Sequence, residues 1–110
     1  MLFTDFTAGN ATYKLRLNTR NIVELEKKLG CNPLAIFGVE GEEIPTVTQM
    51  VTILFYSLQA FNHGITFDDA YSIFDDYLAD GNTITDFIYV ILEIYKTSGM
   101  IRESEEKGKN

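Results

Sequence analysis

The sequence has little of what enzymes, exported proteins and membrane proteins usually need. Cys31 is the single cysteine and His63 the single histidine, so no internal disulfide can form and neither a zinc site nor a catalytic set is easily assembled. The first residues lack the basic and apolar segments of an export signal, and no apolar run approaches the roughly 20 residues of a membrane span. We therefore predict a soluble cytosolic protein that is not an enzyme and uses no cofactor, metal ion or membrane.

Positive charge is missing from most of the chain. No Lys or Arg occurs between Leu29 and Tyr95, and the net charge is −7. Nucleic-acid binding needs a basic surface, so this segment would repel phosphate, and a basic protein is the natural partner. A solubilising coat without a partner explains the same acids equally well. The acids of this segment are Glu40, Glu42, Glu43, Asp68, Asp69, Asp75, Asp76, Asp80, Asp86 and Glu93.

One fragment of a metal-binding motif occurs and has a simpler explanation. The run that begins at Asp76 places Gly81 at the sixth position, as in a calcium-binding loop. Leu78 stands at the third position and Phe87 at the twelfth, where oxygen ligands are required. The run is better explained as the end of an amphipathic helix.

Residue periodicity predicts one α+β domain that is mainly helical. Apolar and polar side chains alternate over residues 2–7 and 12–17 around a Gly-Asn turn, which predicts an N-terminal β-hairpin. Helical spacing and end signals predict four to five helices in a small bundle after it. Residues 1–100 would form this single domain and the charged residues 101–110 a disordered tail. The predicted helices span residues 19–29, a short turn at 33–37, then 46–63, 66–80 and 83–96.

A strand is the alternative for the last of these segments. Residues 84–95 are rich in β-branched and aromatic side chains, which favour strands. Thr83 followed by Asp86 resembles a capping box, and Gly99 is a typical helix-ending residue. We therefore favour a helix.

Two of the predicted helices carry more apolar side chains than one small domain can bury. Residues 46–63 and 83–96 are apolar round most of their circumference, and only one helix of so short a chain can be central. We predict that the excess aromatic side chains contact another copy or an apolar partner, flanked by acids of the 66–80 helix. The alternative is that the hairpin and the short helix cover them. The candidate partner-binding residues are Tyr56, Phe61, Tyr89, Tyr95, Asp68, Asp69, Asp75 and Asp76.

Three consecutive motifs near the N-terminus resemble the start of a known protein family. Residues 13–20 read YKLRLNTR, residues 22–30 read IVELEKKLG, and residues 32–34 read NPL. A strand with basic residues, a helix ending in Glu-x-x-Leu-Gly and an Asn-Pro turn, in this order, resemble the tail assembly chaperones of phages and prophages of Gram-positive bacteria. The helical and acidic remainder of the chain is compatible with that family.

The resemblance implies a function and partners. Such a protein binds the long tape measure protein during tail morphogenesis, keeps it soluble and helps to recruit the major tail tube protein. It acts in the cytoplasm of the bacterial host, self-associates as a homo-oligomer and is absent from the mature virion. Many members are also made in a longer form, by a ribosomal frameshift near the C-terminus.

Two other functions remain as alternatives. A structural head–tail connector or tail completion protein would be found in purified phage particles, whereas a chaperone would not. An acidic inhibitor that mimics nucleic acid would carry its acids at phosphate-like spacing on one exposed surface, for which the 66–80 helix is the candidate.

Overall fold

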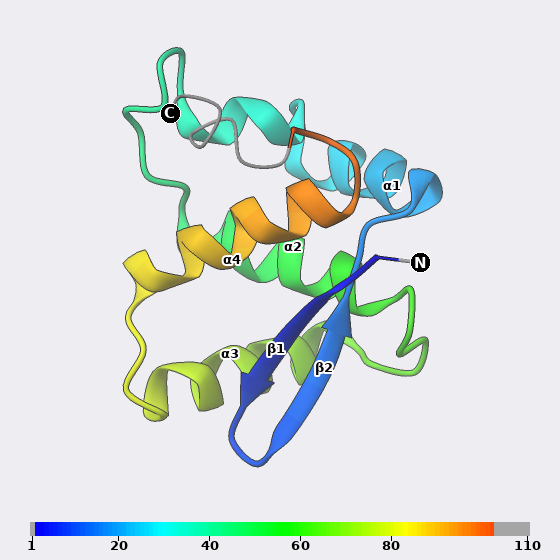
Figure 1. Cartoon of the computed structure of the whole chain (residues 1–110), viewed down its shortest axis with the longest axis vertical. Helices are drawn as coiled ribbons and strands as arrows, with labels where there is room; N and C mark the ends of the chain where they lie inside the picture. The colour runs from blue at the N-terminus through cyan, green and yellow to red at the C-terminus, as the bar shows by residue number, and fades with distance from the viewer. Residues whose placement is uncertain (1, 103–110) are drawn as a thin grey trace.

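The computed structural model describes residues 2–102 and has the α+β, mainly helical architecture that the sequence predicts. An N-terminal hairpin and α3 lie at one end of the molecule, α1 and the short helix η1 at the other, and α2 and α4 between them (Figure 1). Within the described part of the chain, no helix is long and apolar enough to cross a membrane. The elements are β1 (Thr4–Ala8), β2 (Ala11–Leu15), α1 (Thr19–Leu29), η1 (Pro33–Phe37, a 3₁₀ helix), α2 (Val47–Leu58), α3 (Phe67–Ala79) and α4 (Ile84–Thr97).

The hairpin is confirmed, with strands somewhat shorter than predicted. β1 and β2 pair antiparallel from Thr4 opposite Leu15 to Ala8 opposite Ala11, and Gly9 takes a positive φ of 64° in the tight turn. Side chains alternate along β1, so that Phe6 is buried in the domain core. A two-stranded sheet is marginal by itself, and this one is stabilised because its inner face packs on α2, α3 and α4.

Capping boxes define the starts of all four α-helices. In each, the N-cap side chain accepts a hydrogen bond from the third helical residue, whose side chain accepts one from the N-cap N–H. In α4 these partners are Thr83 and Asp86, at 2.8 and 3.1 Å. This segment is therefore helical, and the strand alternative is wrong. The other N-cap residues are Asn18, Thr46 and Thr66.

The second long helix is shorter than its apolar pattern predicts. α2 ends at Leu58, whereas the predicted helix ran to residue 63. After Leu58 the main chain forms tighter turns, since the N–H of Gln59 donates to the carbonyl of Tyr56 and that of Phe61 to the carbonyl of Leu58, both at 3.3 Å. The Gln59 side chain donates to the carbonyl of Ile65 at 3.0 Å within these turns. The apolar pattern continues through these turns and does not reveal them.

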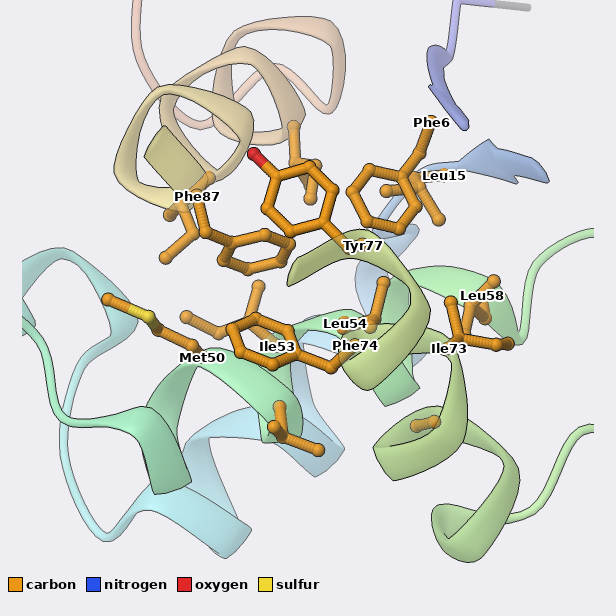
Figure 2. Close-up of a cluster of buried hydrophobic side chains, with 14 of the residues drawn as sticks. Phe6, Leu15, Met50, Ile53, Leu54, Leu58, Ile73, Phe74, Tyr77 and Phe87 are labelled. Carbon is orange, nitrogen blue, oxygen red and sulfur yellow. The ribbon is translucent and has the colours of Figure 1, made fainter. Parts of the chain in front are cut away.

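The core lies around α2, which contacts α1, α3, α4 and β2. An aromatic cluster closes it on the hairpin side, where Phe6, Phe74, Tyr77 and Phe87 meet (Figure 2). Ring centroids in this cluster are 5.0 to 6.1 Å apart, and most of the ring pairs meet edge to face. Of the two apolar helices that the sequence singled out, α2 is the central one.

Hydrogen bonds join the two ends of the described chain. The Arg16 Nη1 atom donates to the carbonyl oxygens of Leu2 at 2.8 Å and of Thr97 at 2.7 Å. The hydroxyl groups of Thr4 and Thr97 lie 3.0 Å apart. Ile101, which the tail prediction included, packs against the core, and the rest of the predicted tail beyond residue 102 lies outside the described residues.

Candidate functional site

The four aromatic residues predicted to be available to a partner differ widely in exposure. Tyr89 is 71% exposed and Phe61 is 38% exposed, whereas Tyr56 is half-buried and Tyr95 is fully buried. The structure therefore separates them into different surroundings instead of gathering them into one surface.

The prediction that Tyr95 is available to a partner is wrong. Its hydroxyl group donates a 2.9 Å hydrogen bond to the carbonyl oxygen of Pro33, and its ring meets Phe37 edge to face at 6.4 Å. Burial, with a smaller contribution from Cys31, raises the pKa of Tyr95 above its ordinary value. The short helix η1 covers this end of α4, as the alternative interpretation of the sequence proposed.

The Phe61 ring contacts other side chains of the domain. Its ring lies edge-on to Phe3 with centroids 5.8 Å apart. The Lys14 ammonium lies 4.9 Å from the Phe3 centroid and 5.8 Å from that of Phe61. Through this small cluster, the start of the hairpin packs against the turns after α2.

Four other rings form a continuous surface, which we call the α2–α3 aromatic patch: Phe55, Tyr56, Phe67 and Tyr71. Phe55 and Phe67 stack with centroids 4.2 Å apart. Tyr56 meets both edge to face, at 4.9 and 6.3 Å, and Tyr71 lies 6.2 Å from Phe67. Tyr71 is 52% exposed, and the other three are half-buried. The patch is therefore preformed and still offers aromatic area to a ligand.

A base and two acids border the patch. The Lys28 ammonium of α1 lies 5.5 Å from the Phe67 centroid. Asp68 and Asp75 are exposed and lie on the same side of α3 as Tyr71, given a helical turn of 3.6 residues. A partner that covers the rings therefore meets negative charge along one edge.

The other two predicted aspartates face away from this patch. Asp69 caps α3, accepting a 2.9 Å bond from the N–H of Thr66. Asp76 and Asp80 share the stripe of Asp69 and lie at the hairpin turn, where the N–H of Gly9 donates to Asp80 at 2.7 Å. Asp69 and Asp80 thus accept hydrogen bonds within the fold and Asp76 lies beside the hairpin turn, so only Asp68 and Asp75 of the predicted set border the rings.

Sequence reasoning missed Phe67 and Tyr71 as surface residues. Both fall on the apolar side of the 66–80 helix together with Phe74 and Leu78, and neither was among the predicted partner-binding residues. Only the inner part of that side meets α2, with Ala70, Ile73, Phe74 and Tyr77 buried. The available signals were that Tyr71 lies at the margin of the apolar side and that Phe67 is the first residue of the helix.

The sole histidine lines an open depression of about 470 Å³ beside the start of α1. Its wall contains Asn18, Thr19, Arg20, Asn21, Gln59, Ala60 and His63. Thr19 carries the only hydroxyl group in this wall, which contains no thiol and no carboxylate. Over residues 2–102, no three His, Cys, Asp or Glu side chains come close enough together to hold a metal ion.

Comparison with known proteins gives a family and no function. No curated protein and no solved structure matches this chain. A family model described as "Family of unknown function (DUF6096)" matches residues 4–110, nearly the whole sequence. The chain thus belongs to the DUF6096 family, a family of unknown function.

Proposed function

We propose that this protein is a non-catalytic binding protein that holds a basic, amphipathic helical segment of another polypeptide on the α2–α3 aromatic patch. Following the resemblance of residues 13–34, the protein is a phage tail assembly chaperone and the polypeptide is the tape measure protein. It acts in the host cytoplasm during tail morphogenesis, assists recruitment of the major tail tube protein and is absent from the mature virion.

The α2–α3 aromatic patch is the observation that carries this proposal. Aromatic side chains give large contact areas with little loss of side-chain entropy, so they are typical centres of protein interfaces. The stacked pair of Phe55 and Phe67 holds the surface rigid, and Tyr71 projects from it. An amphipathic helix binds such a surface through apolar residues three and four positions apart.

Charge selects the kind of helix that fits. Asp68 and Asp75 attract Lys or Arg on the polar side of a bound helix. The net charge of −7 also keeps loaded copies apart, because like-charged complexes repel one another in solution. Both properties suit a protein that keeps a long, aggregation-prone helical chain soluble.

The nucleic-acid mimic is the weaker alternative. Asp69, Asp80 and Asp86 accept main-chain hydrogen bonds within the domain, so their carboxylates serve helix caps and the hairpin turn. A phosphate mimic needs a regular row of free acids on one surface. The acids left on α3 are too few for such a row.

The decisive experiment is co-expression with the tape measure protein encoded in the same genome, with the soluble, co-purified tape measure protein measured as the yield. We expect Asp68→Lys combined with Asp75→Lys to lower this yield roughly tenfold, because each reversal replaces an attraction of up to about 1 kcal/mol by a repulsion. Tyr71→Ala should weaken binding in the same way.

The matched control is Glu40→Lys with Glu42→Lys, which makes the same charge change in the exposed loop before α2. The control should leave the yield unchanged. Equal yields from the patch variant and the wild type would exclude the patch as the binding surface. Absence of any complex with the wild-type protein would exclude the tape measure protein as its partner. Detection of the protein in purified phage particles by mass spectrometry would instead identify it as a connector.

A further inference from the structure

The outward side of α4 is a second exposed surface, separate from the α2–α3 aromatic patch. Figure 1 shows α4 lying across the front of α2, which it contacts. Its inner side is buried through Phe87, Ile91, Ile94 and Tyr95. On the opposite side Tyr89 is 71% exposed and Leu92 is half-buried. We call this outward side the α4 outer face; its members are Asp86, Tyr89, Leu92, Glu93 and Lys96.

Charges along the α4 outer face are arranged so that the face complements itself. Asp86 lies in the first turn and Lys96 in the last, about 15 Å apart along the axis at 1.5 Å per residue. Tyr89 and Glu93 lie between them, and both pairs are centred on residue 91. When two such helices run antiparallel about that centre, the acid of each lies level with the base of the other.

We propose that the α4 outer face pairs with the same face of a second copy of this chain, antiparallel and about a twofold axis near residue 91. In this arrangement Asp86 of each copy meets Lys96 of the other, so the contact contains two such pairs. The Tyr89 hydroxyl group of each donates a hydrogen bond to the Glu93 carboxylate of the other. Leu92 of both copies lies at the centre of the contact.

The charge distribution of the whole chain favours a second copy as the occupant and this face as the contact. Two molecules of net charge −7 repel one another across most of their surfaces. Lys96 is the first base after Lys28, so the α4 outer face is the place in this long acidic stretch where each copy offers a base to the other's acid. A parallel pairing would instead place Asp86 against Asp86.

The contact is small, so the dimer is a weak one. α4 has 14 residues, a length of about 21 Å, and a pair of such helices buries less area than stable dimers do. The proportion of dimer should therefore rise steeply with protein concentration. The α4 outer face shares no residue with the α2–α3 aromatic patch, so the test of this dimer is independent of the test of the proposed client.

The test is sedimentation equilibrium of the full chain from about 10 μM to about 500 μM. We expect the wild type to dimerise in this range. Asp86→Lys and Lys96→Glu should each weaken the homodimer at least roughly tenfold, because each places like charges together at two positions.

An equimolar mixture of the two variants should recover the wild-type affinity. In the mixed dimer, the lysine introduced at position 86 of one copy meets the glutamate introduced at position 96 of the other. The second contact keeps the native pair, Asp86 of one copy with Lys96 of the other. Only an antiparallel pairing gives this recovery.

Asp86→Lys also removes a capping side chain of α4, so circular dichroism must show that this variant folds. Cross-linking provides a second measurement that does not depend on this variant. In a Cys31→Ser background, Leu92→Cys should form an intermolecular disulfide under mild oxidation and Tyr71→Cys should not. A wild type that stays monomeric at the highest concentration overturns the proposal. So does a dimer unaffected by Lys96→Glu, or one that cross-links through position 71 instead of 92.

Discussion

Replacing Phe87 by alanine is expected to lower the free energy of unfolding by about 3–5 kcal/mol, a large part of the 5–15 kcal/mol typical of a domain this size. The ring is fully buried and joins α4 to the hairpin and α3, with centroids 5.8 Å from Phe6, 5.1 Å from Phe74 and 5.7 Å from Tyr77. Its removal leaves a cavity where three elements meet, and these cannot all move inward to fill it.

Urea unfolding followed by far-ultraviolet circular dichroism measures this loss. The matched control is Ile84→Ala in the first turn of the same helix, where the side chain is 41% exposed. The control should cost about 1 kcal/mol or less. A similar, small effect of both substitutions would mean that the aromatic cluster is not the centre of the core.

The second large effect is expected from Tyr95→Phe, which should cost about 1–3 kcal/mol at neutral pH. The substitution keeps the ring and removes the hydroxyl group that donates to the Pro33 carbonyl oxygen at 2.9 Å, so a buried acceptor loses its partner. Tyr89→Phe makes the same chemical change six residues earlier on α4, at a side chain that is 71% exposed. It should change stability by no more than about 0.5 kcal/mol.

The same two variants should also differ in how their free energy of unfolding changes at alkaline pH. Burial raises the pKa of Tyr95 in the folded state above the ordinary tyrosine value of about 10. Stability from the protonated hydroxyl group is therefore fully present below pH 10, and it falls as the pH rises from 10 towards the folded pKa, since only the unfolded chain releases the proton.

The fall between about pH 10 and 11 should be shallower in Tyr95→Phe than in the wild type or Tyr89→Phe. A residual slope belongs to Tyr77, whose pKa is also raised, first by burial and then by the charge of Asp86. Identical slopes in Tyr95→Phe and Tyr89→Phe would show that the Tyr95 hydroxyl group is solvated.

Short-range signals made most of the fold predictable. The Gly-Asn turn indicated the hairpin. Thr83 and Asp86, which stand three residues apart, indicated the start of a helix, although the residues that follow favour a strand. The end of α2 was mispredicted because the apolar pattern continues past Leu58, where the main chain already turns. The hydrogen bond from Gln59 to the carbonyl of Ile65 depends on how that turn folds.

The surface was less predictable, because exposure depends on contacts distant in sequence. Tyr89 and Tyr95 stand on one apolar helix and are equivalent by composition, yet the carbonyl of Pro33, 62 residues away, determines that Tyr95 is inside. Tyr71 shares the apolar side of its helix with Phe74, and only the position of α2 divides that side into a buried and an exposed part. Periodicity gives the direction of a side chain but not what lies opposite it.

The link between Arg16, Leu2 and Thr97 has a consequence for synthesis on the ribosome. The hairpin is made before α4, and the helix carbonyl to which Arg16 donates is added 81 residues after Arg16. At about 5–20 residues per second this takes about 4–16 s, during which the nascent strands lack the surface that stabilises them. The hairpin therefore reaches its final packing only after α4 has been made, as a late event in the folding of this domain.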